Sequence, residues 1–218
     1  MSEGTPAPTE LRPSNRRLEA FSDAVFAIVA TIMMFEIRIP DTLAFGSDHA
    51  ALMEFSALLG TYALSFVVIA ILWANHHYLI FTLPKADRPT IWLNNNALFW
   101  VTLIPIVARF FGMHPTAPRA AAAYAFVIMM CTISFSLLRR HAGRISHNAF
   151  HRSLHRRVFR RIWPAIALYA AAMPLAFVDI RLAWACLVVL PAMFFLPVIR
   201  AEDEPKPAVA EQAASAGG

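Results

Sequence analysis

Long apolar runs separated by short polar segments divide this chain into six candidate helices. A membrane-spanning helix needs about 20 mostly apolar residues, and several of the runs reach that length. The pattern therefore predicts an all-α polytopic membrane protein whose spans cover residues 17–37, 53–82, 91–112, 119–138, 162–178 and 181–199. We expect the last two, which are short, to form a hairpin around a tight turn at residues 178–181.

The two ends of the chain differ in composition from its apolar middle. Residues 1–15 and 200–218 are rich in Pro, Ala, Ser and Glu, and such segments are expected to be disordered. Residues 16–199 are expected to form one six-helix transmembrane domain, because no second copy of any segment is evident. The first apolar run contains Asp23 and has no good cleavage site, so we expect it to remain as a helix.

The distribution of basic residues predicts the orientation of these helices. Fifteen of the 19 Lys and Arg residues lie on the side that carries both termini, and four lie on the other side. Cytoplasmic loops carry the excess of positive charge, so both termini are predicted to be cytoplasmic. The formal charge of +5 therefore reflects topology, and we expect no nucleic-acid partner.

Much of that positive charge lies in one segment, residues 139–161. Arg152, Arg156 and Arg160 are evenly spaced, but the intervening His and Arg residues leave too little apolar surface for a membrane span. The opposite face has an apolar residue at every fourth position, namely Phe150, Leu154, Val158 and Ile162. This pattern predicts a basic amphipathic helix at the cytoplasmic membrane surface, either a solvated connection or a site for anionic lipids.

The first apolar run carries polar groups at membrane depth, which makes it the main candidate for function. Ser22 and Asp23 lie in its first turns, and Glu36 lies near its end. An ionisable group at the bilayer centre costs about 2.5–3.5 kcal/mol on insertion scales, so such groups usually face a partner helix or water. Possible N–H donors to Asp23 at a similar depth are Trp73, Asn75, His76, His77 and Asn94.

Helical geometry separates Asp23 from an apolar stripe on the same helix. At about 100° per residue, the stripe lies within about 60° of Ile28, whereas Asp23 falls about 140° away. The residues of the stripe are Ala24, Ile28, Thr31, Ile32 and Phe35. Periodicity alone leaves two interpretations open: packing in a core, or a hydrophobic constriction in which Thr31 offers oxygen to a partly dehydrated cation.

The remaining motifs argue against catalysis and against a metal site. Adjacent His76 and His77 diverge by about 100° on a helix, whereas two metal ligands from one helix need a spacing of three or four residues. Cys131 and Cys186 lie inside apolar runs, which indicates reduced, packed thiols. No nucleotide-binding glycine loop and no nucleophile motif occurs, so we predict no catalytic residue, no metal and no cofactor.

Three motifs resemble one known family. Residues 17–23 read Arg-x-x-x-Phe-Ser-Asp and are followed by an apolar run and Phe-Glu-Ile at residues 35–37, which resembles the signature of the transmembrane-protein-175 family of potassium channels. Trp-x-Asn-His-His at residues 73–77 resembles the second-helix motif of that family. Leu93-Asn94 and the later Leu-Ile-Pro are similar to its third helix. The resemblance covers about residues 16–112.

The resemblance implies a subunit in which the first helix lines a central pore, and the single-repeat bacterial branch implies a homotetramer. On the matching positions, Ile28 is the hydrophobic bottleneck and Thr31 the hydroxyl one turn outward. Phe35 takes an outer apolar position at which the family commonly has Leu or another aliphatic residue. Ala24 and Ile32 would also face the pore. Potassium is the implied permeant species.

Polar residues around Asp23 are expected to clamp the first helix to the second and third. This clamp set consists of Arg17, Phe21, Ser22, Asp23, Trp73, Asn75, His77 and Asn94. An ideal helix puts Arg17 on the apolar stripe, so we expect it to turn toward its partners at the helix end. The alternative for the polar group is a proton relay through Asp23 and His76 or His77.

These observations lead to three hypotheses. The first is a potassium-selective or potassium-preferring channel of the bacterial inner membrane, constricted at Ile28, with Glu36 attracting cations at the outer mouth. The second is a proton-coupled secondary transporter that uses Asp23 with His76 or His77. The third is a structural or lipid-binding membrane protein that uses residues 139–161.

Overall fold

The computed structural model describes residues 15–35, 37, 49–83, 85–146 and 149–194, and all regular elements in these ranges are α-helices. The predicted disordered ends, residues 1–15 and 200–218, lie outside the described residues except for Asn15, and so does Glu36. The helices are α1 (Asn15–Phe35), α3 (His49–Phe81), α4 (Arg88–Thr102), α5 (Ile104–Met113), α6 (Pro118–Ile145), α7 (Ala149–Val178) and α8 (Ile180–Phe194). The all-α prediction is confirmed.

Membrane-spanning length is reached by 4 segments of the described chain, at residues 15–35, 51–81, 88–113 and 118–145. The third of these combines α4 and α5, which correspond to one predicted span. Shorter apolar helices cover residues 162–178 and 180–189, where the last two of the six spans are predicted. The chain is therefore an integral membrane protein.

The break between α4 and α5 at Leu103 has a cause in the sequence. Pro105 lies in the first turn of α5, where it needs no backbone N–H, but inside a continuous helix its ring would clash with the carbonyl of Val101. The chain therefore tightens at Leu103, whose N–H donates to Trp100 O over 3.2 Å. The predicted single span at residues 91–112 is thus two helices with a kink.

The predicted surface helix of residues 139–161 is not a separate element. Its first part forms the end of α6, and residues 149–161 begin α7, which continues to Val178. The helix continues from residue 161 into the apolar run that follows, although Pro164 lies just inside that run. The predicted tight turn before the last helix is present at Asp179, whose carboxylate accepts a 2.8 Å hydrogen bond from Arg181 N.

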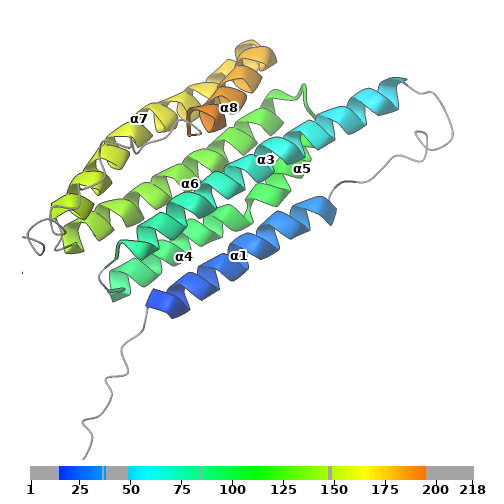
Figure 1. The fold of residues 1–218 in the computed structure, drawn as a ribbon. Coiled ribbons are helices and arrows are strands. Elements are labelled where there is room, and N and C mark those ends of the chain that lie inside the picture. The colour runs from blue at the N-terminus through cyan, green and yellow to red at the C-terminus, as the bar shows by residue number, and fades with distance from the viewer. Residues whose placement is uncertain (1–14, 36, 38–48, 84, 147–148, 195–218) are drawn as a thin grey trace, which may run out of the picture.

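The helices lie side by side in an elongated bundle. Figure 1 shows α1 along one edge, α7 and α8 at the opposite edge, and the remaining helices between them. Helix α1 contacts α3, α4 and α5, while α6 packs against α4, α5, α7 and α8. Fully buried alanines at the centre let these helices approach closely; they are Ala97, Ala120, Ala121, Ala125, Ala172 and Ala183.

Candidate functional site: an exposed helix face and its polar clamp

Helix α1 has one face that packs against its own subunit. Its buried residues are Leu18, Ser22, Phe26, Val29 and Met33. They recur at intervals of three or four positions, which puts them on one side of the helix, toward α3, α4 and α5. Because this face is buried in the core of the subunit and contains no residue of the predicted stripe, the stripe lies on another side of the helix.

The predicted apolar stripe is exposed along its whole length within one subunit. All five residues, Ala24, Ile28, Thr31, Ile32 and Phe35, are exposed. Ile28 keeps 55% of its surface and Phe35 82%. The stripe is therefore not part of the core of its own subunit, which leaves lipid or further copies of the chain to cover it.

Thr31 supplies the polar atom of this stripe. Its hydroxyl donates to the backbone of its own helix, with Ala27 O and Ile28 O both at 2.9 Å. A hydroxyl that donates inward keeps oxygen lone pairs free to accept, and these can coordinate a cation on the exposed side. The stripe can thus offer one oxygen per subunit among apolar side chains.

A fully buried hydrogen-bond chain ties α1 to α4 and α3. Asn94 Nδ2 donates to Ser22 Oγ over 3.0 Å, and the Ser22 hydroxyl donates to Leu18 O over 2.8 Å. Asn94 Oδ1 lies 2.7 Å from His76 Nε2, so this ring nitrogen carries the proton and donates to the amide oxygen. Ser22, His76 and Asn94 have no exposed surface. One asparagine therefore connects three helices.

The surroundings of His76 are mainly aromatic. The rings of Phe26 and Phe135 lie 5.6 and 5.9 Å from its imidazole, measured between centroids. Within the described part of the chain, His76 Nδ1 is buried and has no hydrogen-bond partner. The ring is thus a neutral donor packed among aromatic residues, which fits a structural role.

A second set of contacts lies toward the surface, one turn of helix away. Trp73 Nε1 donates to Asp23 Oδ1 over 2.9 Å. The indole also stacks on His77, at 5.9 Å between ring centroids, and His77 Nδ1 lies 3.3 Å from Glu19 Oε1. These contacts join α1 to α3 beside the buried chain, so the clamp has a buried layer and an exposed layer.

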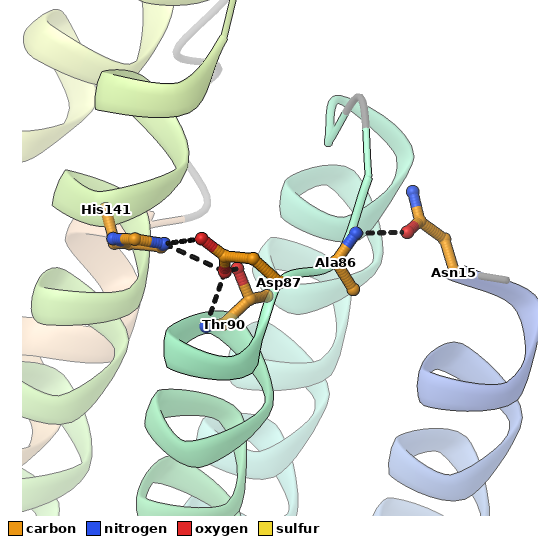
Figure 2. A network of polar contacts seen from close by, with 5 residues as sticks. All are labelled: Asn15, Ala86, Asp87, Thr90 and His141. Atoms are coloured by element: carbon orange, nitrogen blue, oxygen red, sulfur yellow. Dashed lines mark hydrogen bonds and ion pairs between the residues drawn. The ribbon is translucent and has the colours of Figure 1, made fainter. Parts of the chain in front are cut away.

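The start of α1 is held by the turn between α3 and α4. Asn15 Nδ2 donates to Leu83 O over 2.9 Å, and Ala86 N donates to Asn15 Oδ1 over 2.8 Å. In Figure 2 the adjacent Asp87 accepts hydrogen bonds from Thr90, at the start of α4, and from His141 of α6. The turn therefore links the first residue of α1 to α6.

Two opposing effects act on the carboxyl of Asp87. Its partial burial favours the neutral acid, while the hydrogen bonds from Thr90 and the interaction with His141 favour the anion. The second effect prevails and holds the pKa of Asp87 below its ordinary value of 3.8. His141 Nε2 lies 3.0 Å from both carboxylate oxygens, so the carboxylate is held by α6 as well as by its own helix.

Not every residue of the predicted clamp set lies in this cluster. Asn75 donates to Ile71 O of its own helix over 2.9 Å instead of reaching α1. Arg17 and Phe21 are exposed, Phe21 at 56%, and neither takes part in the hydrogen bonds of the clamp. Ser22, Asp23, Trp73 and Asn94 are brought together, and His77 joins them through Glu19.

Three contributors were not predicted for the clamp. His76 is among the possible donors to Asp23 and in the proposed proton relay, but it is not in the predicted clamp set, although its place in the Trp-x-Asn-His-His motif points to this region. Glu19 lies one turn before Asp23 and could have been found from that spacing. Asn15 carries the residue type that often begins a helix, which was a usable signal.

The described residues offer no set of ligands for a metal ion. No three His, Cys, Asp or Glu side chains within those ranges lie close enough to hold one. His76 is buried while the side chain of His77 is 49% exposed, so the two imidazoles face different surroundings. Cys131 and Cys186 are both free.

A groove runs between α1 and α3 beside the clamp. Its volume is about 530 Å³, and Asp23 and Trp73 lie among its lining residues. The other walls are apolar, supplied by Phe26, Ala27, Ala30, Phe66, Ile69 and Ala70. The groove and the exposed stripe together leave much of α1 without a partner among the described residues of its subunit.

Comparison with known proteins connects this region to ion channels. A family model described as "Endosomal/lysosomal potassium channel TMEM175" matches residues 17–105, a range that contains both the stripe and the clamp of α1, α3 and α4. A protein of Chryseobacterium sp. named as a potassium channel is 37% identical over 122 residues, which cover 56% of this chain and 62% of that protein.

A second relative, from Streptomyces collinus and also named as a potassium channel, is 33% identical over 135 residues, or 60% of this chain and 66% of the relative. The chain thus spans just under two thirds of the length of these two proteins. The solved structure of a lysosomal potassium-selective channel TMEM175 homolog from Chamaesiphon minutus is similar over most of the fold. Its TM-score is 0.73 at 27% identity, over 88% of this chain and 98% of that chain.

Proposed function

Because this chain belongs to the TMEM175 family, we propose that it is a potassium-selective or potassium-preferring channel whose pore is lined by α1. One observation supports this most directly: α1 presents a continuous exposed stripe from Ala24 to Phe35 while its opposite face carries the subunit core. The exposed stripe of such a helix must be covered by lipid or by protein. The same helix from other copies of the chain, arranged around a symmetry axis, can cover it.

In this proposal four copies surround the pore, and Ile28 forms its narrowest ring. A hydrophobic constriction gates by excluding water, so Ile28 is both constriction and gate. Thr31 lies one turn further out and contributes an oxygen from each copy. Phe35 forms an outer apolar ring, and Glu36 raises the local concentration of cations at the outer mouth.

Selectivity must come from side chains and from the width of the pore. None of the seven glycines lies in α1, so a glycine-rich loop of carbonyl oxygens cannot form there. The helix backbone is hydrogen-bonded internally, which leaves the Thr31 hydroxyl as the oxygen of the stripe. Removing part of the hydration water costs less free energy for a potassium ion than for a sodium ion. This difference favours potassium in a narrow apolar pore.

The groove between α1 and α3 supports assembly from several copies. It lies beside the stripe, and a neighbouring α1 could pack into it while its own stripe faces the axis. We propose a homotetramer in the bacterial inner membrane with both termini in the cytoplasm, following the excess of basic residues on that side.

The alternative of a proton-coupled transporter has weaker support. Asp23 is bonded to the indole of Trp73, and His77 pairs with Glu19 rather than with Asp23. His76 is enclosed by two phenylalanines and bonded to an amide. No continuous path of titratable groups joins Asp23 to either histidine in these contacts, and the relatives named as potassium channels favour a channel.

The experiment that tests the pore is potassium flux from liposomes containing the purified protein. We expect Ile28→Asn to raise the flux severalfold, because a polar ring is wetted more easily than an isoleucine ring. Leu137→Asn is the matched control, since Leu137 is also exposed, at 45%, but belongs to α6. A protein that passes no potassium, with Ile28→Asn having no effect, would refute the assignment.

A cysteine ring tests the shared axis independently. In a background with Cys131→Ser and Cys186→Ser, Ile28→Cys should make the flux sensitive to micromolar Cd²⁺, because thiolates from several copies converge on one ion. Leu137→Cys in the same background should be insensitive. Equal insensitivity of both variants would place Ile28 away from any axis.

A further inference from the structure

Arg139 is a buried cation with no counter-ion in the part of the chain that the structure describes. It lies in α6 near the end of that helix and keeps 7% of its surface exposed. Its guanidinium donates one hydrogen bond, from Nη2 to the backbone oxygen of Asn75, over 3.2 Å. Within the described ranges no carboxylate pairs with it, although a guanidinium has five N–H donors and its charge is expensive to bury unpaired.

The buried guanidinium forms part of the wall of a cavity. The cavity measures about 60 Å³ and lies between α3, α6, α7 and α8. On α6 it is lined by Ile128, Thr132, Phe135 and Arg139, which share one face of the helix over three turns. Arg139 is the last of this series, so the cavity has an apolar length and a cationic end.

The α3 side of the cavity also changes from apolar to polar toward the end where Arg139 lies. Val68 and Leu72 line the apolar part, and Asn75 lies at the end with Arg139. The volume is several times the minimum that one water molecule needs, but most of the wall offers water no hydrogen-bond partner. An apolar chain that ends in an anionic group would match both parts of the cavity.

We propose that this cavity binds an anionic phospholipid, with its phosphate on Arg139 and part of one acyl chain along the apolar wall. Arg139 lies near the same end of the bundle as His141 and the turn that holds the start of α1, which is the cytoplasmic end in the proposed orientation. Anionic headgroups are found at that depth, and a guanidinium binds phosphate through two parallel hydrogen bonds. The acyl chain then runs toward the centre of the membrane.

Another source of negative charge exists in the chain itself. The sequence after α8 contains Glu202, Asp203 and Glu204, and these carboxylates are possible partners for a guanidinium. An acidic peptide does not match three turns of apolar wall, however, whereas an acyl chain does. The phospholipid is therefore the better occupant.

Lipid binding to the purified, delipidated protein is the test, measured by native mass spectrometry with phosphatidylglycerol and phosphatidylcholine of identical chains. We expect the first phosphatidylglycerol to bind at least about tenfold more tightly than phosphatidylcholine, and Arg139→Gln to remove that preference. Arg140→Gln is the matched control, because Arg140 is the next residue of α6 and is exposed. It should change the affinity by less than twofold.

A second variant tests the apolar part without changing the charge. Leu72→Phe adds atoms at a half-buried wall position and should weaken binding of both lipids by a similar factor. If Arg139→Gln fails to fold, the lipid preference of the wild type together with the Leu72→Phe effect decides the proposal. Unfolding temperature and oligomer mass are measured for every variant.

Four results would overturn the proposal. They are an equal affinity for the two lipids, an equal loss in Arg139→Gln and Arg140→Gln, displacement of phosphatidylglycerol by equimolar oleate, and a gain in affinity when residues 201–218 are removed. The third would assign the cavity to a free fatty acid and the fourth to the tail of the chain. None of these measurements uses ion flux, so a failure of the proposed pore would leave them interpretable.

Discussion

Asp23 accepts a 2.9 Å hydrogen bond from the indole of Trp73, on a side of α1 that Ile28 does not share. The carboxylate that attracts attention in the sequence is thus bound to a neighbouring helix by a neutral donor. Apolar residues and one threonine occupy the exposed stripe instead. This division of α1 leads to different expectations for substitutions on its two sides.

Asp23→Asn should be tolerated, because its amide oxygen still accepts the hydrogen bond from Trp73. We expect its potassium flux to stay within about twofold of wild type and its unfolding temperature to be nearly unchanged. Asp23→Ala removes the acceptor and should cost about 1 kcal/mol, in the range of hydrogen bonds between membrane helices. Loss of flux in a folded Asp23→Asn protein would favour a proton relay.

Asn94→Ala should be the most damaging polar substitution in the clamp. It removes one bond to Ser22 and one to His76 and leaves the imidazole N–H unpaired in a fully buried place. The expected loss is about 1–3 kcal/mol of unfolding free energy. Asn95→Ala is the control, since Asn95 is exposed on the same helix, and the two variants are compared by denaturant titration in detergent. Similar losses in both would argue against the clamp.

The sequence identifies the residues of the stripe on α1, because they follow from a helical period within one segment, but it leaves open whether the stripe is buried or exposed. It does not identify the partners of Asn94, which come from positions 18 and 72 residues away and depend on how three helices rotate against one another. The same limit applies to His76 and His77. Adjacent helical residues differ by about 100°, and only packing decides which of the two is buried.

Acid should abolish the contribution of Asp87 to stability. Its pKa is lowered in the folded protein, so its stabilising effect is present above the ordinary value of 3.8 and is lost as the pH falls through the lower folded value. The difference in unfolding temperature between wild type and Asp87→Asn should therefore be largest above pH 5 and shrink toward pH 3. Circular dichroism melts across this range measure it. A constant difference at every pH would contradict the role of the anion.

The two described glycines of α3 and α5 should respond to alanine in opposite directions. A Cβ at Gly112 would lie 2.8 Å from Leu58 Cδ1 and 3.2 Å from Leu58 Cα, so α5 must move away from α3. Gly112→Ala should lose about 1–3 kcal/mol. Gly60→Ala meets nothing within 4 Å and should gain about 0.5–1 kcal/mol from better helix propensity. Thermal unfolding of both variants in one detergent compares them, and a stabilised Gly112→Ala would refute the close approach.

The sequence also does not predict that residues 149–178 form one continuous helix. Their composition changes from basic to apolar, which indicates two environments and suggested two elements, but backbone hydrogen bonding does not stop where composition changes. The kink at Leu103 is the opposite case. Hydropathy hid it inside one apolar run, although Pro105 marked the place.

The polar contacts of α1 lie near its start, and the rest of the helix is held by apolar contacts alone. Within residues 15–35, every hydrogen bond or ion pair that it makes with another element involves Asn15, Glu19, Ser22 or Asp23. Beyond them, Phe26, Val29 and Met33 hold the helix by apolar contact, which tolerates sliding because it has no direction. A small rotation about the clamp is thus magnified toward Phe35, and the outer half of the helix can swing without breaking a hydrogen bond.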